Sequence, residues 1–352
     1  MDNLTHSLFA LTLARTPLGR AGRGATVTLV LASNAPDSDI AIALTHGGGA
    51  YLTAHRGSSH GPLGVVGFAL VVASLVYLGL AWRRRKGPVP SPPEATWPRL
   101  VALALVGTLG HVLMDLPTSY GTRSLSPFED RWFTIDLMPI VDVYLLALFG
   151  GGLAAVYTRR KSQGAIAAVV LMLMLANYGL RAGMHTRALG LARSGQPPVP
   201  TLSRWPDAPY PKLPDDFACA APPCTLSLAA LPTFGSPLVW RIVRQSSGGY
   251  QLADLNVWSG VEEPIGWEPS GADAAVTVAR GAEASRQLLR FSRFPTARIE
   301  RHGDETLVMF SDVRFLDRPL SRRSEEFRPG GLFSVTVRLD RHGRILDERF
   351  GS

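Results

Sequence analysis

Apolar runs of bilayer-spanning length constrain this sequence more than any other feature. Residues 62–82 contain no charged side chain, and a helix that crosses a bilayer needs roughly 20 apolar residues. Two weaker stretches, 4–14 and 25–44, are short or interrupted by polar residues, so they either span fully or dip into the membrane and return. Three further runs of near-spanning length follow at 100–116, 137–157 and 165–180. We therefore predict a polytopic membrane protein, and a charged fraction of only 18% argues against a wholly soluble globule.

Basic clusters between the apolar runs predict the orientation. Arginines and lysines gather at 15–23, 83–86 and 159–161, after the first, third and fifth apolar stretches. Because cytoplasmic loops carry an excess of Lys and Arg, we expect all three clusters on the cytoplasmic side of the membrane. The N-terminus, the loops 45–61 and 117–136 and the chain after about residue 184 are then outside. The net charge of +8 therefore indicates membrane anchoring, and no nucleic-acid partner is expected.

The composition changes abruptly after about residue 195. A Pro-rich segment, 191–214, cannot continue a helix, and beyond it short runs such as 331–339 alternate as strands do. The predicted fold class is an all-α polytopic membrane domain of about four to six spans over residues 1–190, followed by this linker. A small, mainly β extracytoplasmic domain is then expected over residues 215–352.

The sequence has two cysteines, Cys219 and Cys224, and both lie in the predicted outer domain. In an oxidising compartment a local disulfide between them would persist, and two unpaired buried thiols are the alternative. Two cysteines exclude a cysteine-built zinc module or an iron–sulfur site. Any metal ligands are therefore expected to be histidines and carboxylates.

Histidine and aspartate side chains from separate segments gather on the predicted outer side. His111 and Asp115 are four residues apart, hence on one face of a helix, and such a pair can grip one cation. Acids inside membrane spans are expensive and indicate function. Of nine acids in residues 1–200, all but Glu94 fall on the predicted outer side. The candidate metal ligands are His6, Asp37, His55, His60, His111 and Asp115.

Each of these residues also has a non-functional explanation. A histidine at a membrane interface is commonly a wetted helix end, and acids in spans can form ion pairs, proton relays or a transport path. Several carboxylates placed together without a cation would repel one another in a low dielectric, which favours a metal for the cluster as a whole. Imidazole and carboxylate ligands without thiolate favour a divalent ion, zinc first, with manganese or iron as alternatives.

An ordered series of short motifs resembles a known family. Over about residues 1–185 the series is similar to the bacterial inner-membrane metal-dependent hydrolases, also known as LexA-binding, inner-membrane-associated hydrolases. This resemblance implies a membrane-embedded helical domain with a divalent-metal site, and the segments 292–295 and 312–315 resemble the outer domain of many members. Ser59 stands where threonine is common. The motifs are Met1-Asp2-Asn3-Leu4-Thr5-His6-Ser7, Ser33-Asn34-Ala35-Pro36-Asp37-Ser38-Asp39, His55-Arg56-Gly57-Ser58-Ser59-His60, Gly110-His111-Val112-Leu113-Met114-Asp115, Thr118-Ser119-Tyr120-Gly121-Thr122, Ser126-Pro127-Phe128, Asp130-Arg131-Trp132 and Asp136.

Two functions from different classes stay open. The first is a metal-dependent hydrolase at the outer leaflet, with a phosphoester or lipid-related substrate favoured by analogy with zinc phospholipases. Asp136 is then the candidate general base, Asp39 a ligand or a second catalytic acid, and Arg56 a group that neutralises a phosphate. The second is a non-enzymatic membrane protein, such as a cation or proton transporter or an envelope-stress scaffold. The lipid bilayer is a partner in both.

Overall fold

The computed structural model describes residues 1–87, 92–194, 225–246, 248–269, 273–316 and 333–351. The predicted linker was placed too early, because helix α7 continues to Arg193; residues 195–214 of that linker and both cysteines lie outside the described residues. The chain divides into two compact units. The first unit comprises Met1–Asp39, Arg56–His185 and Pro232–Pro237, and the second comprises Ile40–His55, Thr186–Leu231 and Leu238–Ser352.

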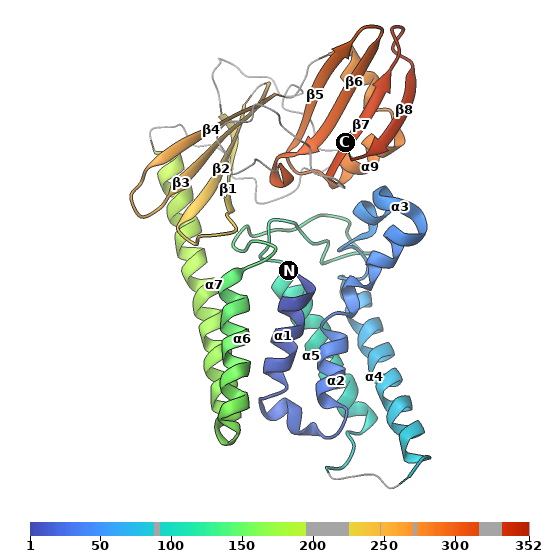
Figure 1. Ribbon diagram of the computed structural model, residues 1–352, viewed down its shortest axis with the longest axis vertical. Helices are drawn as coiled ribbons and strands as arrows, with labels where there is room; N and C mark the ends of the chain where they lie inside the picture. Colours follow the sequence, from blue (N-terminus) through green and yellow to red (C-terminus); the bar gives the residue numbers. More distant parts are fainter. Residues whose placement is uncertain (88–91, 195–224, 247, 270–272, 317–332, 352) are drawn as a thin grey trace. The chain divides into compact units, whose positions relative to one another are not determined.

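The first unit is helical, as predicted (Figure 1). Within the described residues, three helices are long and apolar enough to cross a membrane, and a fourth span exists if α2 and the following segment are one broken span. The four-span count meets the lower end of the prediction, since α1 and α6 are short. The helices are α1 (Asn3–Leu13), α2 (Ala25–Ala32), α4 (Pro62–Arg84), α5 (Trp97–Asp115), α6 (Val143–Thr158) and the start of α7 (Gln163–Arg193).

Two of the apolar runs differ from their predicted form for local reasons. The run 137–157 becomes helical only at Val143, because the Asp142 carboxylate caps α6 by accepting from the backbone N of Leu145 at 2.8 Å. The stretch 25–44 breaks after α2 into the 3₁₀ helix η2 (Ala35–Ile40), which includes a proline. Helix α3 (Ala41–Ala54) then belongs to the second unit. The break after α2 places Asp37 and Asp39 in η2, next to the end of that helix.

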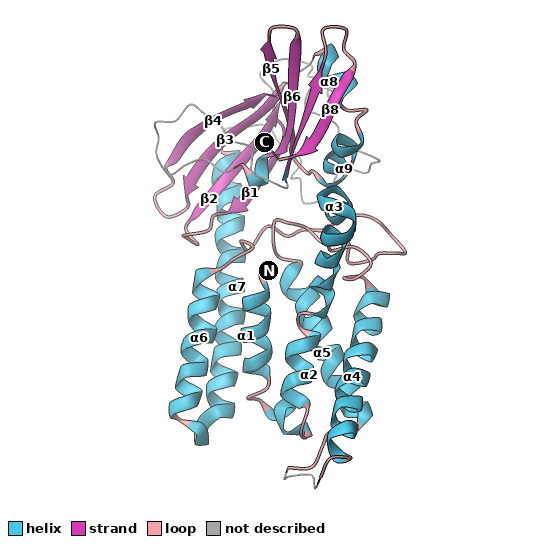
Figure 2. Cartoon of the chain, turned by 45° about the vertical axis from the view of Figure 1, so that its right-hand side comes forward, coloured by secondary structure: helices cyan, strands magenta, loops and turns pink. Residues whose placement is uncertain are grey.

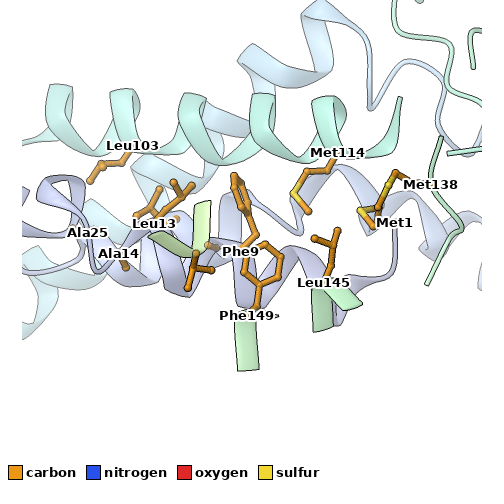
Figure 3. Close-up of a cluster of buried hydrophobic side chains, with 13 residues drawn as sticks. Met1, Phe9, Leu13, Ala14, Ala25, Leu103, Met114, Met138, Leu145 and Phe149 are labelled. Atoms are coloured by element: carbon orange, nitrogen blue, oxygen red, sulfur yellow. The ribbon is translucent and has the colours of Figure 1, made fainter. Parts of the chain in front are cut away.

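Small and apolar side chains hold the first unit together. Phe9 of α1 meets Phe149 of α6 edge to face, with ring centroids 6.2 Å apart, in the buried cluster of Figure 3. Gly107 of α5 lies against α2 so closely that a Cβ there would be 2.7 Å from the Cβ of Ala32. Only glycine permits this approach of two helices. It fixes α5, and therefore His111 and Asp115, relative to α2.

The three basic connections lie at the same end of the first unit. Figure 1 shows the α1–α2, α4–α5 and α6–α7 connections together at the lower end of the helices. These connections carry the three predicted cytoplasmic clusters. A single end of the helical unit therefore carries the positive charge that the orientation argument needs.

We expect reporter fusions along the chain to alternate between the two sides of the membrane. Fusions after Lys86 and Lys161 should report the cytoplasm, and fusions after Arg123 and Gly195 the outside, because basic connections stay in the cytoplasm. Paired alkaline phosphatase and green fluorescent protein reporters measure this. A cytoplasmic signal at Gly195 would reverse the assignment of the second unit.

The second unit contains two four-stranded antiparallel sheets, which agrees with the predicted mainly β domain (Figure 2). Helices α8 (Ala274–Ala279) and α9 (Glu283–Phe291) separate the sheets in sequence. The predicted strand 331–339 appears as β7, and its predicted turn closes at Gly343, whose N donates to Asp340 O at 2.9 Å. The strands are β1 (Thr225–Pro232), β2 (Val239–Ser246), β3 (Gly249–Asn256) and β4 (Glu262–Pro269), then β5 (Pro295–His302), β6 (Glu305–Asp312), β7 (Ser334–Leu339) and β8 (Ile345–Phe350).

Asp312 at the end of β6 is a buried polar centre of this unit. Its Oδ2 accepts hydrogen bonds from Ser292 Oγ at 2.8 Å, from the backbone N of Arg293 at 2.7 Å and from Arg314 Nη2 at 2.8 Å. The two family-like segments 292–295 and 312–315 therefore meet at one carboxylate. Burial alone would raise the pKa of Asp312, but the Arg314 charge and these hydrogen bonds outweigh it and hold that pKa below its ordinary value.

Replacing Asp312 by asparagine should destabilise the second unit by about 3 kcal/mol at pH 7, because it leaves the buried Arg314 without its counter-charge. A carboxylate whose pKa is lower in the folded state stabilises the fold fully at pH values above its unfolded pKa of about 3.9. This contribution to stability is lost as the pH falls through the folded pKa. The difference between wild type and variant should therefore shrink in acid. Hydrogen exchange of the β5–β7 amides measures it, with the exposed Asp347→Asn as control. Equal exchange rates of the two variants at pH 7 would contradict the stabilising role of the Asp312 carboxylate.

Candidate metal centre

Four side chains of the first unit converge at the end opposite the basic connections. Asp37 comes from η2, where the chain leaves α2, and His60 comes from the turn that precedes α4. His111 and Asp115 come from the last turn of α5 and, as their spacing predicts, face the same way. One ligating atom from each lies within 4.8 Å of the other three.

The distances between these atoms form a compact polyhedron. His60 Nε2 lies 3.1 Å from His111 Nε2, 3.5 Å from Asp37 Oδ1 and 3.2 Å from Asp115 Oδ2. His111 Nε2 lies 3.4 Å from both Asp37 Oδ1 and Asp115 Oδ2. In a tetrahedral zinc site with bonds of about 2.0 to 2.1 Å the ligand atoms are about 3.3 Å apart. The residues therefore fit a single small cation.

Hydrogen bonds fix the tautomers of both histidines. His111 Nδ1 lies 2.8 Å from the carbonyl oxygen of Ser33, which can only accept, so Nδ1 carries the proton. Ser59 Oγ donates its hydrogen to Asp39 Oδ2 at 2.7 Å and therefore accepts from His60 Nδ1 at 2.9 Å. In the neutral rings both Nε2 atoms then present lone pairs to each other and to two carboxylates. Partners that orient a ring in this way are typical of the groups behind metal-binding histidines.

Burial makes this arrangement costly without a cation. His111 and Asp115 are fully buried and His60 is 1% exposed. Asp37 Oδ1 and Asp115 Oδ2 are buried atoms that accept no hydrogen bond in the described part of the chain. Burial lowers the pKa of His60 to about 3, so its ring is neutral at pH 7, which is the form that binds metals. Four lone-pair donors thus face one point, and a cation would satisfy all of them.

The second oxygen of Asp115 faces positive groups instead. Asp115 Oδ1 accepts from Arg56 Nη2 at 3.0 Å and pairs with the α-amino group of Met1. Arg56 also donates to Thr118 Oγ1 at 2.8 Å, and its guanidinium lies 4.6 Å from the centre of the Tyr120 ring. Arg56 is therefore held inside the protein, where it orients Asp115. The expected contact of Arg56 with a phosphate stays a prediction.

The remaining predicted site residues are not among these four clustered side chains. His6 is fully buried, stacks on His111 with centroids 3.9 Å apart, and its Nε2 is 3.4 Å from Asp115 Oδ1. Asp39 accepts from the backbone N of Arg56 at 3.2 Å and acts on His60 through Ser59. Asp136 is buried and accepts from Thr134 Oγ1 at 3.1 Å. His55 ends α3 in the second unit, where its ring stacks on Tyr51. Their functional roles stay predictions.

Sequence reasoning missed the groups that orient the ligands. The carbonyl oxygen of Ser33 is a backbone atom, so the residue type at position 33 does not indicate that it contacts His111. Ser59 was noticed only as a departure from threonine, although its hydroxyl joins Asp39 to His60. Thr118 Oγ1 accepts from Arg56 and donates to the carbonyl oxygen of Asp115 at 2.7 Å. A search for hydroxyl residues next to candidate ligands would have found Ser59.

Comparison with known proteins places the chain in a family. The family model described as "YdjM inner membrane protein" matches residues 1–186, so the chain belongs to that family. It is also similar to "Uncharacterized protein YfhP" of Bacillus subtilis (strain 168), at 24% identity over 119 residues, or 34% of this chain and 32% of the relative. This chain thus covers about a third of that relative. No solved structure matches it significantly. The family description supports the inner-membrane location and names no activity.

Proposed function

We propose that this member of the YdjM inner membrane protein family is a divalent-metal-dependent hydrolase. Asp37, His60, His111 and Asp115 would hold the ion, with zinc favoured and manganese or iron as alternatives. The observation that carries the proposal is the convergence of the His60 and His111 Nε2 atoms, 3.1 Å apart, with two carboxylate oxygens at the same point. The proposed location is the outer end of the spans, because the basic connections are at the other end.

A hydrolase needs a route for water and substrate to this cluster. Asp37 is the most exposed of the four, with 11% of its side chain accessible, whereas the other three side chains are closed off. Water would therefore arrive on the side of Asp37. Two imidazoles and two carboxylates would fill a tetrahedral shell, so the proposed hydrolysis needs the ion to take water as a fifth ligand, an expansion that catalytic zinc sites can undergo.

The proposed roles of the residues follow from their contacts. A bound divalent cation would polarise a phosphoryl or carbonyl oxygen and lower the pKa of a water molecule. Ser33 and Ser59 hold the two imidazoles in the metal-binding tautomer. Arg56 holds Asp115 and offsets its charge. Asp136 is the proposed general base, and Asp39 keeps His60 oriented through Ser59.

A phosphoester of lipid or envelope origin is the proposed substrate class. The location at a membrane surface favours a substrate that the bilayer presents. The arginines of the 117–136 loop would attract a phosphate: the Arg123 guanidinium lies 3.5 Å from the exposed Asp130 carboxylate and 5.1 Å from the centre of the Trp132 ring. A cation or proton transporter is less favoured, because the described buried ionic groups of the helices lie towards one end.

The experiment is a substrate screen with purified protein in detergent. Phosphodiester, phosphomonoester, ester and amide probes are offered with and without added zinc or manganese, and Asp115→Asn is the matched control. We expect turnover of one phosphoester class that needs both the metal and Asp115. Absence of metal-dependent turnover on every class, together with cation flux in vesicles that requires Asp115, would replace the hydrolase by a transporter.

A further inference from the structure

A groove separate from the metal cluster lies between α2 and α4, towards the basic end of both helices. Its volume is about 550 Å³, within the range of small-molecule sites. Val27 and Leu31 of α2 and Leu75, Val76 and Leu80 of α4 form its apolar walls. His60 lies before the first residue of α4, whereas the groove uses the last turns of that helix. The groove therefore belongs to the opposite membrane surface from the metal cluster.

Two arginines and a tryptophan line the basic end of the groove. Arg23 precedes α2, and Trp82 and Arg83 lie in the last turn of α4. The backbone of Arg23 is fixed, because its N donates to Pro93 O at 2.9 Å and its carbonyl accepts from Ala95 N at 3.1 Å. Arg83 is exposed. Tryptophan and arginine at a span end mark the level of the lipid headgroups.

We propose that this groove binds an anionic phospholipid of the bilayer, with an acyl chain between α2 and α4 and the phosphate between Arg23 and Arg83. The apolar walls match a hydrocarbon chain, and the two guanidiniums match a phosphate, which arginine binds in a bidentate manner. Basic pockets between transmembrane helices on the cytoplasmic side are the type of site that retains anionic headgroups. A zwitterionic lipid carries a compensating positive charge, so it gains less from two arginines.

Glycine at position 79 keeps the groove open. A Cβ added at Gly79 would meet no atom within 4 Å, although Gly79 lines the groove. A large side chain at position 79 would therefore start from open space in the wall of the groove. Gly67 on the same helix is equally unobstructed and does not line the groove. The pair Gly79→Phe and Gly67→Phe thus separates filling of the groove from a general change on α4.

The experiment measures lipid selectivity of the full-length protein in phosphatidylcholine bilayers. Spin-labelled phosphatidylglycerol or spin-labelled phosphatidylcholine is added, and electron paramagnetic resonance gives the motionally restricted fraction of each. We expect the wild type to prefer phosphatidylglycerol, Gly79→Phe to lose that preference and Gly67→Phe to keep it. Arg83→Gln and Arg23→Gln should each lower the preference about fivefold, and Arg85→Gln, outside the groove, should not.

Two outcomes would overturn the proposal. Equal preference in Gly79→Phe and Gly67→Phe would show that lipid is not held in the groove. An equal loss in Arg85→Gln and Arg83→Gln would show a general attraction of the basic loop for anionic lipid. Thermal unfolding in detergent verifies that each variant is folded, and His111→Ala should leave the preference unchanged, because it acts at the other end of the spans.

Discussion

The His111→Ala protein should purify without its metal, whereas the wild type should carry about one divalent ion per chain. His111 Nε2 lies 3.1 to 3.4 Å from the other three proposed ligand atoms, so the substitution removes a ligand that adjoins all three of them. His60 cannot replace the lost imidazole, because its own Nε2 already belongs to the cluster. Elemental mass spectrometry of the detergent-purified proteins gives the metal content directly.

Two further variants make that loss informative. His342→Ala removes an exposed histidine of the β7–β8 turn and should leave the metal content unchanged. Asp39→Asn keeps all four proposed ligands but weakens the hydroxyl bridge that orients His60, and should lower the affinity by about 10- to 100-fold. Full metal content in His111→Ala would remove His111 from the centre.

The second large effect concerns turnover. Asp115→Asn should abolish both metal binding and hydrolysis, because the substitution removes a charged ligand from the buried cluster. Asp136→Asn should reduce turnover by roughly 10²- to 10⁴-fold and leave the metal in place, as expected for a general base that is not a ligand. Metal content and kcat, measured on the same preparations, separate the two roles.

The folding of these variants needs its own measurement, since Asp115 also pairs with Arg56. Circular dichroism and thermal unfolding in detergent should show a helical protein in both cases, because the apolar packing of α1, α5 and α6 is untouched (Figure 3). Loss of metal in Asp136→Asn would make Asp136 a ligand. Unchanged turnover in Asp136→Asn would exclude it as the base.

Much of the first unit could be predicted, because its determinants are local. The uncharged run 62–82 becomes α4, and the His111 and Asp115 spacing places both on one face of α5. The predicted run 137–157 began before the observed start of α6 at Val143, because a hydropathy pattern does not show that Asp142 caps the helix. The broken second stretch left two alternatives, and the structure bends it at η2.

The long-range geometry could not be predicted from spacing. The sequence predicts His60 and His111, 51 positions apart, as ligands of one metal site, but not that their Nε2 atoms directly contact each other or that the Ser33 carbonyl fixes one ring. Nor does it indicate that Arg56 is directed to Asp115. The contact between Ser33 and His111 depends on how closely α2 and α5 pack at Gly107, which is a property of the assembled helices.

Anomalous X-ray diffraction from crystals of the metal-loaded protein tests the central claim most directly. At the absorption edge of the bound metal we expect one strong peak about 2.0 to 2.2 Å from His60 Nε2, His111 Nε2, Asp37 Oδ1 and Asp115 Oδ2 if the ion is zinc. A peak bound by other residues, or a metal-loaded protein with no peak between these four side chains, would contradict the account.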